Sequence, residues 1–118
     1  MSASSQQTVQ SHFAARSANV KATYNALLRA VRAFGPVEQQ PKKTSIHLAR
    51  RTAFAGVATQ REALVLTVKS PVDIKNARIR KHERASANRW HLELKLSHPD
   101  EVDGELIDWL RSAYDMSA

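Results

Sequence analysis

The 118-residue chain contains no cysteine, and it has few glycine, proline and aromatic residues. The absence of cysteine excludes disulfides, thiolate-bound zinc and thiol catalysis, and it makes a reducing cytoplasm the expected location. Three scattered glycines, Gly35, Gly56 and Gly104, exclude a glycine-rich phosphate-binding loop. No apolar run approaches the roughly 20 residues that a membrane-spanning helix requires, so no membrane partner is expected.

Basic residues outnumber acidic ones, and the excess is unevenly distributed. The chain has 18 Lys and Arg against 11 Asp and Glu, which gives a formal net charge of +7. Residues 42–98 carry 13 basic and 4 acidic side chains, a net +9, whereas residues 99–118 carry Arg111 against six acids, a net −5. This asymmetry indicates either an anionic partner for one face or charge pairing within the molecule.

Two segments have the apolar spacing of amphipathic helices. In residues 17–34, apolar side chains recur at intervals of three and four, with Ser17 as N-cap and Gly35-Pro36 as stop signal. In residues 103–115 the same spacing follows an N-cap at Asp103. Each segment has a single apolar stripe, so both are predicted to pack against a sheet.

Between these helices the apolar period changes to two, which predicts strands near 45–48, 52–59, 64–69, 77–82 and 89–97. Residues 37–43 are expected to be a connector. The strand at 52–59 is apolar on both faces and should be central, and Gly56 within it predicts a bulge or a close approach by a helix. Alternation places Trp90 in the core.

These elements predict an α+β fold, in which an antiparallel four- to five-stranded meander sheet is packed on one face by an N-terminal and a C-terminal helix. Residues 1–12 are expected to form a flexible polar tail, and residues 13–118 a single α+β domain.

Five short motifs follow one another along the chain: FGPV at 34–37, FAGVA at 54–58, SPVDIKNARIRK at 70–81, RWHLELKLS at 89–97 and EVDGELIDWLRSAY at 101–114. In this order they resemble a bacterial family of domains of unknown function, DUF5655, over roughly residues 12–115. The resemblance implies a small α+β domain that occurs alone or appended to others, and it carries over no activity and no site residue. A more distant similarity to small double-wing domains would imply DNA binding by analogy of fold alone.

The candidate binding residues are basic side chains of the predicted sheet: Arg50, Arg51, Lys75, Arg78, Arg80, Lys81, Arg84 and Arg89. Guanidinium groups suit phosphate because their fork of donors matches two oxygens. Arg78 and Arg80 are predicted to share one face of a strand, which Arg89 would join across a hairpin. The set predicts a non-enzymatic binding module for a polyanion such as nucleic acid, without base stacking, since Trp90 is the one aromatic residue nearby.

Other interpretations of the sequence stay open. The charges could form a solvated sheet edge that resists aggregation, or an accessory protein-interaction surface that docks on an acidic partner. Asp73, Glu93 and Lys95 have the order of a Mg²⁺-dependent nuclease site but lack a third carboxylate. His47, His82 and His91 could be neighbours across strands, although surface histidines are the favoured interpretation. No catalytic residue, metal or cofactor is expected, and the oligomeric state stays open.

Overall fold

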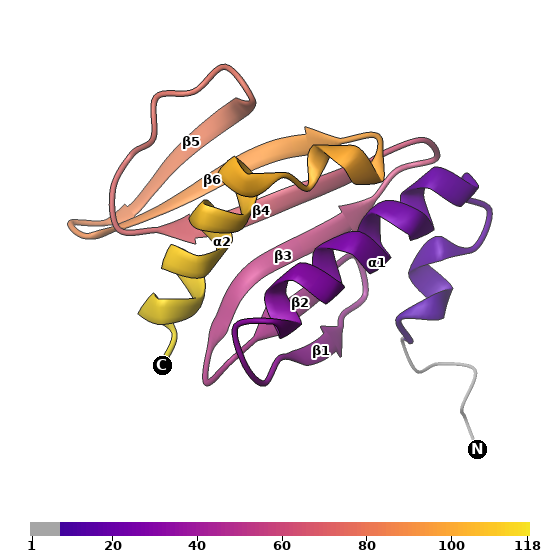
Figure 1. Ribbon diagram of the computed structural model, residues 1–118, viewed down its shortest axis with the longest axis horizontal. Coiled ribbons are helices and arrows are strands. Elements are labelled where there is room, and N and C mark those ends of the chain that lie inside the picture. The colour runs from indigo at the N-terminus through magenta and orange to yellow at the C-terminus, as the bar shows by residue number, and fades with distance from the viewer. Residues whose placement is uncertain (1–7) are drawn as a thin grey trace.

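The structure, a computed structural model, describes residues 8–118 and shows an α+β fold. One antiparallel sheet forms a layer, and two helices lie side by side on one of its faces (Figure 1). The helices are α1 (Ala18–Arg32) and α2 (Gly104–Met116), with short 3-10 helices η2 (Gln10–Phe13) and η3 (Pro99–Glu101) before them. The strands are β1 (Glu38–Pro41), β2 (Ile46–Ala49), β3 (Ala53–Thr59), β4 (Leu64–Ser70), β5 (Ile79–Ser86) and β6 (Arg89–Leu96).

Both predicted helices are present, with ends that differ by one or two residues from the prediction. Asp103 caps α2 as expected, because its side chain accepts a hydrogen bond from the Leu106 N–H at 3.1 Å. Ser17 occupies the N-cap of α1 but makes no capping hydrogen bond through its side chain. Gly35, the predicted stop, has a φ of +151°, a conformation that favours glycine. Residues 1–7 of the predicted tail lie outside the described residues, and η2 begins within its remainder.

The sheet has six strands, so the prediction of four or five was too low. The extra strand is β1, which lies in the segment that was expected to be a connector. Its sequence, EQQP, is polar and has no apolar alternation, and it becomes a strand through pairing with β2 from Glu38 opposite Ala49 to Pro41 opposite Ile46. An edge position suits such a segment, because proline cannot donate to a further strand.

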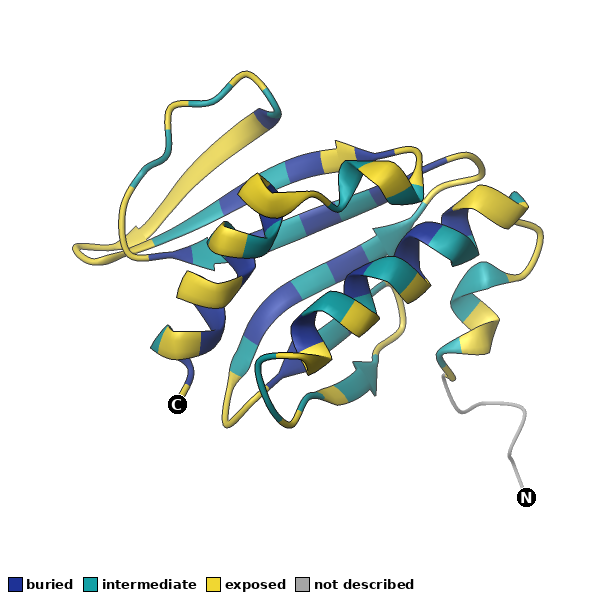
Figure 2. Ribbon diagram, viewed as in Figure 1, coloured by how far each residue is buried: buried dark blue, intermediate teal, exposed yellow. Residues whose placement is uncertain are grey.

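The strand order is β1-β2-β3-β4-β6-β5, which corrects the predicted meander. The chain leaves β4, passes to the outer edge of the sheet as β5, and returns as β6 between them (Figure 1). The burial pattern of the two strands explains why β6, and not β5, lies next to β4. Strand β6 alternates half-buried or exposed residues with the buried Leu92, Leu94 and Leu96, whereas β5 buries Ile79 alone and is otherwise exposed (Figure 2). A charged strand is tolerated at an edge, and the apolar strand fills the interior position.

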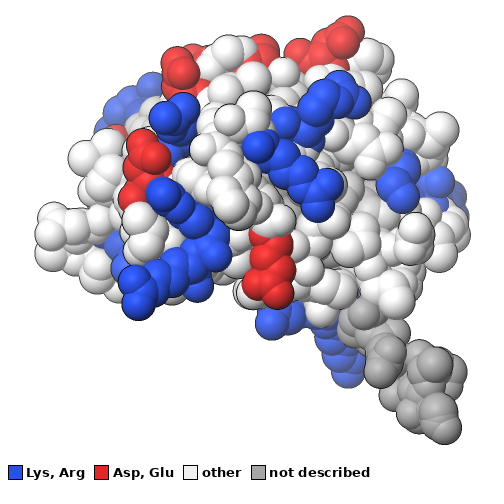
Figure 3. All heavy atoms as spheres, turned by 60° about the horizontal axis from the view of Figure 1, so that its bottom comes forward, with Lys and Arg blue, Asp and Glu red and all other residues white. Residues whose placement is uncertain are grey.

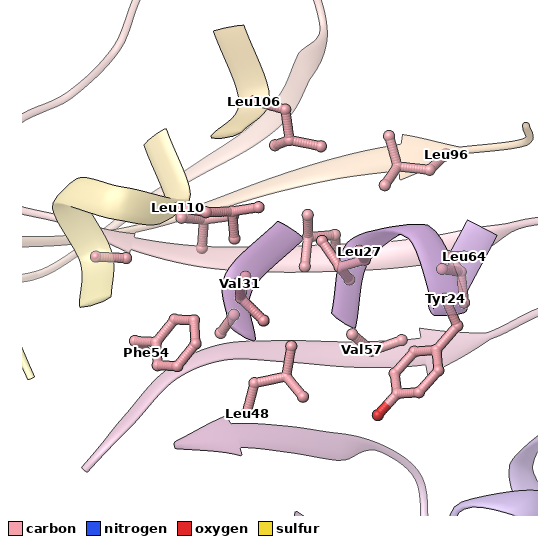
Figure 4. Packing of buried hydrophobic residues seen from close by; sticks show 14 of the residues in the cluster. Tyr24, Leu27, Val31, Leu48, Phe54, Val57, Leu64, Leu96, Leu106 and Leu110 are labelled. Carbon is pink, nitrogen blue, oxygen red and sulfur yellow. The ribbon is translucent and has the colours of Figure 1, made fainter. Parts of the chain in front are cut away.

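The hydrophobic core lies between the sheet and the helices. Alternate residues of the central strands point toward α1 and α2, so buried and half-buried positions alternate along them (Figure 2). Figure 4 shows side chains of both helices among those of the sheet: Leu27 and Val31 from α1 and Leu106 and Leu110 from α2, with Leu48, Phe54, Val57, Leu64 and Leu96 from the strands. All of these are at most 1% exposed.

Strand β3 is central, as predicted, but Gly56 is neither a bulge nor a point of helix approach. The irregularity lies at Phe54, because Leu48 pairs with Ala55 while Ala49 pairs with Ala53. Gly56 keeps regular pairing with His47 and Thr67, on the face away from the helices. The bulge allows Phe54 to turn into the core, where its ring meets Tyr114 edge-on at 5.4 Å.

Candidate binding surface on the open face of the sheet

Both helices lie on the same face of the sheet, and we call the opposite face the open face (Figure 1). Its residues alternate with the core residues along each strand. The pairing of the strands joins one residue from each into a continuous row across all six: Gln40, His47, Gly56, Thr67, Glu93 and Lys81. This face therefore carries polar and charged side chains around a middle formed by small ones.

A hollow of about 390 Å³ lies in the open face. Small residues of the two central strands form its floor: Ala53, Gly56, Ala58, Val65 and Thr67. Ser45, which immediately precedes β2, and His47 of β2 border it on one side. Lys69, His91 and Glu93 border it from β4 and β6 on the other. The hollow exists because the central strand β3 has no side chain larger than a methyl group at these positions.

Basic side chains gather on the β4, β6 and β5 part of the open face. Three of the predicted binding residues lie here, and two more basic residues join them: Arg80, Lys81 and Arg89, with Lys69 and Lys95. Arg80 forms an ion pair with Glu93 at 2.9 Å. Among residues 8–118, the other four have no acidic side chain within ion-pair distance, and we call them the open-face cations.

Two of the open-face cations repel each other. Burial lowers the pKa of Lys69, and the positive charge of Arg89 lowers this pKa further. Within residues 8–118, the Lys69 ammonium makes one hydrogen bond to a side chain, donated to the Ser117 hydroxyl at 3.4 Å, and this group brings no negative charge. Like charges held together without a counter-charge have unfavourable electrostatic energy, which a bound anion would relieve.

Arg78 lies elsewhere, so the prediction that it shares a face with Arg80 is wrong. Its guanidinium contacts both oxygens of Asp103 at 3.0 and 3.2 Å and Glu105 at 3.3 Å. It also donates to the Glu101 carbonyl at 2.7 Å and lies 5.9 Å from the centre of the Trp109 ring. The reason is that the strand begins only at Ile79, and Arg80 is the extra residue of a bulge between Ile79 and Lys81. Arg78 thus ties the segment before β5 to the start of α2.

The remaining predicted residues are dispersed. Arg50 lies over the Tyr114 ring at 4.4 Å and donates to its carbonyl, while Arg51 is exposed beside it in the β2–β3 turn. Lys75 is paired with Asp73 at 3.2 Å in the segment between β4 and β5. Arg84 lies 6.0 Å from the centre of the Trp90 ring. That ring is on the helix side, as alternation predicted, but it is half-buried and outside the core cluster.

The charged surface is consequently divided. On the face in Figure 3, Lys and Arg side chains form separate groups, with uncharged surface and acidic side chains between them. The eight predicted residues do not make one continuous basic band. Ten other Lys and Arg side chains of residues 8–118 also form no ion pair with an acid, so what sets the open-face cations apart is that they lie together on one face of the sheet.

The possible nuclease residues Asp73, Glu93 and Lys95 do not form one site. Asp73 accepts a hydrogen bond from His82 at 2.6 Å, and this bond holds the pKa of the Asp73 carboxyl below its usual value. His82 is paired with Leu92 and belongs to the helix side of the sheet, whereas Glu93 lies on the open face. In the described part of the chain, no three His, Asp or Glu residues are placed to hold a metal ion.

Comparison with known proteins gives a family for the chain. A family model described as a domain of unknown function, DUF5655, matches residues 9–117. The chain belongs to the DUF5655 family. No curated protein and no solved structure matches it. None of the helices within residues 8–118 of this DUF5655 domain is long and apolar enough to cross a membrane.

Lys69 and Lys95 were missed as candidate residues of this DUF5655 domain, although their strand parity is visible in the sequence. Lys69 alternates with the buried Val68, and Lys95 lies between the buried Leu94 and Leu96. What the sequence does not show is that β4 pairs with β6, which places Lys69 directly opposite His91 and next to Arg89. A pairing between strands this far apart in the chain depends on the whole fold.

Proposed function

We propose that this DUF5655 domain is a non-enzymatic module that binds nucleic acid through the open face of its sheet. The observation that carries the proposal is the presence on that face of four cations without an acidic partner among the described residues: Lys69, Lys81, Arg89 and Lys95. We propose that the domain acts in the bacterial cytoplasm, on the basis of the cysteine-free sequence and the family resemblance.

The chemistry of these groups favours phosphate as the anion. Arg89 presents a planar guanidinium that matches two phosphate oxygens, and the lysines add compact charges that tolerate many geometries. A nucleic-acid strand would contact several of these cations at once, and each phosphate that they neutralise releases a condensed counterion. Contacts of this kind are made to the backbone, so they favour binding with little sequence specificity.

The test is a binding titration with labelled single- and double-stranded DNA and RNA at several salt concentrations. Replacing two exposed open-face cations, as Arg89→Gln with Lys95→Gln, should weaken binding to all sequences alike. It should also reduce the slope of log affinity against log salt by about 0.7–0.9 for each phosphate that the variant no longer neutralises. The matched control is Arg29→Gln with Arg32→Gln, which removes the same charge from the exposed surface of α1.

Equal weakening of binding in both double variants would mean that net charge alone drives binding, and it would overturn the assignment to the open face. Failure of every nucleic acid to bind at micromolar protein would overturn the proposal itself. The alternative is then an accessory domain that docks on an acidic protein partner. One observation favours that alternative: β5 is an edge strand, and every one of its residues after Ile79 is exposed.

A further inference from the structure

We infer that the nucleic acid bound by the open face is single-stranded, and that the hollow in this face receives one of its unpaired bases. The inference rests on the proposed function and makes it more specific. It depends on three features of the hollow: its size, the two imidazole rings at its borders, and the position of the cations beside it.

The volume of the hollow suits one small group. At about 390 Å³ it falls near the lower end of the about 300–1,000 Å³ range of small-ligand sites. A duplex keeps its bases stacked inside and presents only its backbone and groove edges, so it offers no free base to such a depression. In a single strand the bases can be unstacked and turned outward into pockets of the protein.

The borders of the hollow provide the contacts that an unpaired base requires. His47 and His91 face it from opposite sides, and imidazole is among the rings on which unpaired bases stack. Thr67 lines the floor, and Ser45 and Glu93 line the borders, so three side chains with hydrogen-bonding groups surround the hollow. The small floor residues between them are uncharged, which suits the flat surface of a base rather than a phosphate.

Gly56 keeps this space open. It is paired with His47 in the sheet, and a Cβ built at Gly56 would lie 3.7 Å from the His47 ring, with no other side chain of the described residues within 4 Å. The backbone there does not have the positive φ that would exclude larger residues. A side chain at this position would therefore be accommodated by the strand and would occupy the place beside the His47 ring.

The cations stand where the flanking phosphates would lie. Lys69 borders the hollow and is paired with His91, and Arg89 lies two residues before His91 on the same face of β6. A base between the two imidazole rings would thus have its own phosphate within reach of this pair. The neutral floor and the charged border match the neutral base and the charged backbone of one strand.

The experiment compares a labelled 12-nucleotide single strand with a duplex of the same sequence, by fluorescence anisotropy at low salt. We expect the single strand to bind at least tenfold more tightly. The variant Gly56→Val, which changes no charge, should remove this preference by weakening single-strand binding about tenfold while leaving duplex binding unchanged. Gly104→Ala is the control, because its added Cβ has no neighbour within 4 Å among the described residues. Thermal unfolding of each variant checks that it is folded.

If Gly56→Val does not fold, the double variant His47→Ala with His91→Ala makes the same test, because removal of the stacking rings should also weaken single-strand binding about tenfold. Equal affinity for single strand and duplex, or an unchanged preference in the folded variants, would overturn the inference and leave the proposed function standing. Absence of binding to both nucleic acids would overturn the proposed function and the inference together.

Discussion

Arg78 is expected to contribute to the stability of the fold rather than to binding, and Arg78→Met tests this. The change removes the guanidinium and keeps an apolar side chain of similar length. It eliminates two ion pairs, with Asp103 and Glu105, together with the hydrogen bond to the Glu101 carbonyl and the cation–π interaction with the Trp109 ring. The side chain of Arg78 is 25% exposed, so these interactions are less screened than those of the other arginines with an ion pair.

The magnitude follows from the environment of each interaction. The two carboxylates are about half-exposed, so each ion pair contributes about 0.5 kcal/mol. The hydrogen bond from a charged donor to the part-buried carbonyl contributes about 1.5 kcal/mol. The interaction with Trp109 adds about 0.5 kcal/mol. The free energy of unfolding should therefore fall by about 3 kcal/mol, which lowers the Tm of a domain of this size by about 12 °C.

Thermal unfolding followed by far-UV circular dichroism measures this effect. The control is Arg80→Met, which removes a single ion pair with Glu93 from a side chain that is 46% exposed. We expect this control to lower the Tm by only about 2 °C. Equal changes in Tm for the two variants would refute the reasoning, because it assigns a joining role to Arg78 alone. At 25 °C, folded Arg78→Met should also bind nucleic acid with the salt dependence of the unchanged protein, since Arg78 does not lie on the open face.

Three further predictions concern stability. Leu94→Ala should lower the free energy of unfolding by about 2–5 kcal/mol in urea, and Leu28→Ala by clearly less, because Leu94 is 1% exposed while Leu28 is only partly buried; equal decreases would contradict this. The pKa of the Asp103 carboxyl is lowered by the Leu106 N–H and by Arg78, so its contribution to stability is present above pH about 4 and disappears as the pH falls further. Asp103→Asn should therefore make the dependence of stability on pH flatter in this acid range, and an unchanged dependence would count against the cap. Gly35→Ala should lower the Tm, because Gly35 has a φ of +151° and a Cβ there would lie 2.5 Å from the Tyr114 hydroxyl; a variant as stable as the parent would show that this close approach relaxes easily.

Local patterns in the sequence were sufficient for the helices and for most of the strands. The apolar spacing of residues 17–34 and 103–115, with their caps, predicted α1 and α2 to within two residues. Alternation predicted which residues of β4 and β6 face the core, as the burial of Leu66 and Leu94 confirms. These features were predictable because helix periodicity, capping and strand alternation depend on residues a few positions apart.

Tertiary structure alone decided the strand order, the edge strand β1 and the neighbours of each charge. Whether β4 pairs with β5 or β6 depends on which strand takes the interior position with a neighbour on each edge, and this is settled by the packing of all the elements together. The same strand order places Arg78 in contact with the start of α2. It also places Lys69 beside Arg89 with no acidic partner among the described residues. The sequence by itself determined how many charges the sheet carries and their alternation along each strand. The fold determined which of them are neutralised, because ion pairs form between residues that only long-range strand pairing and helix packing bring together.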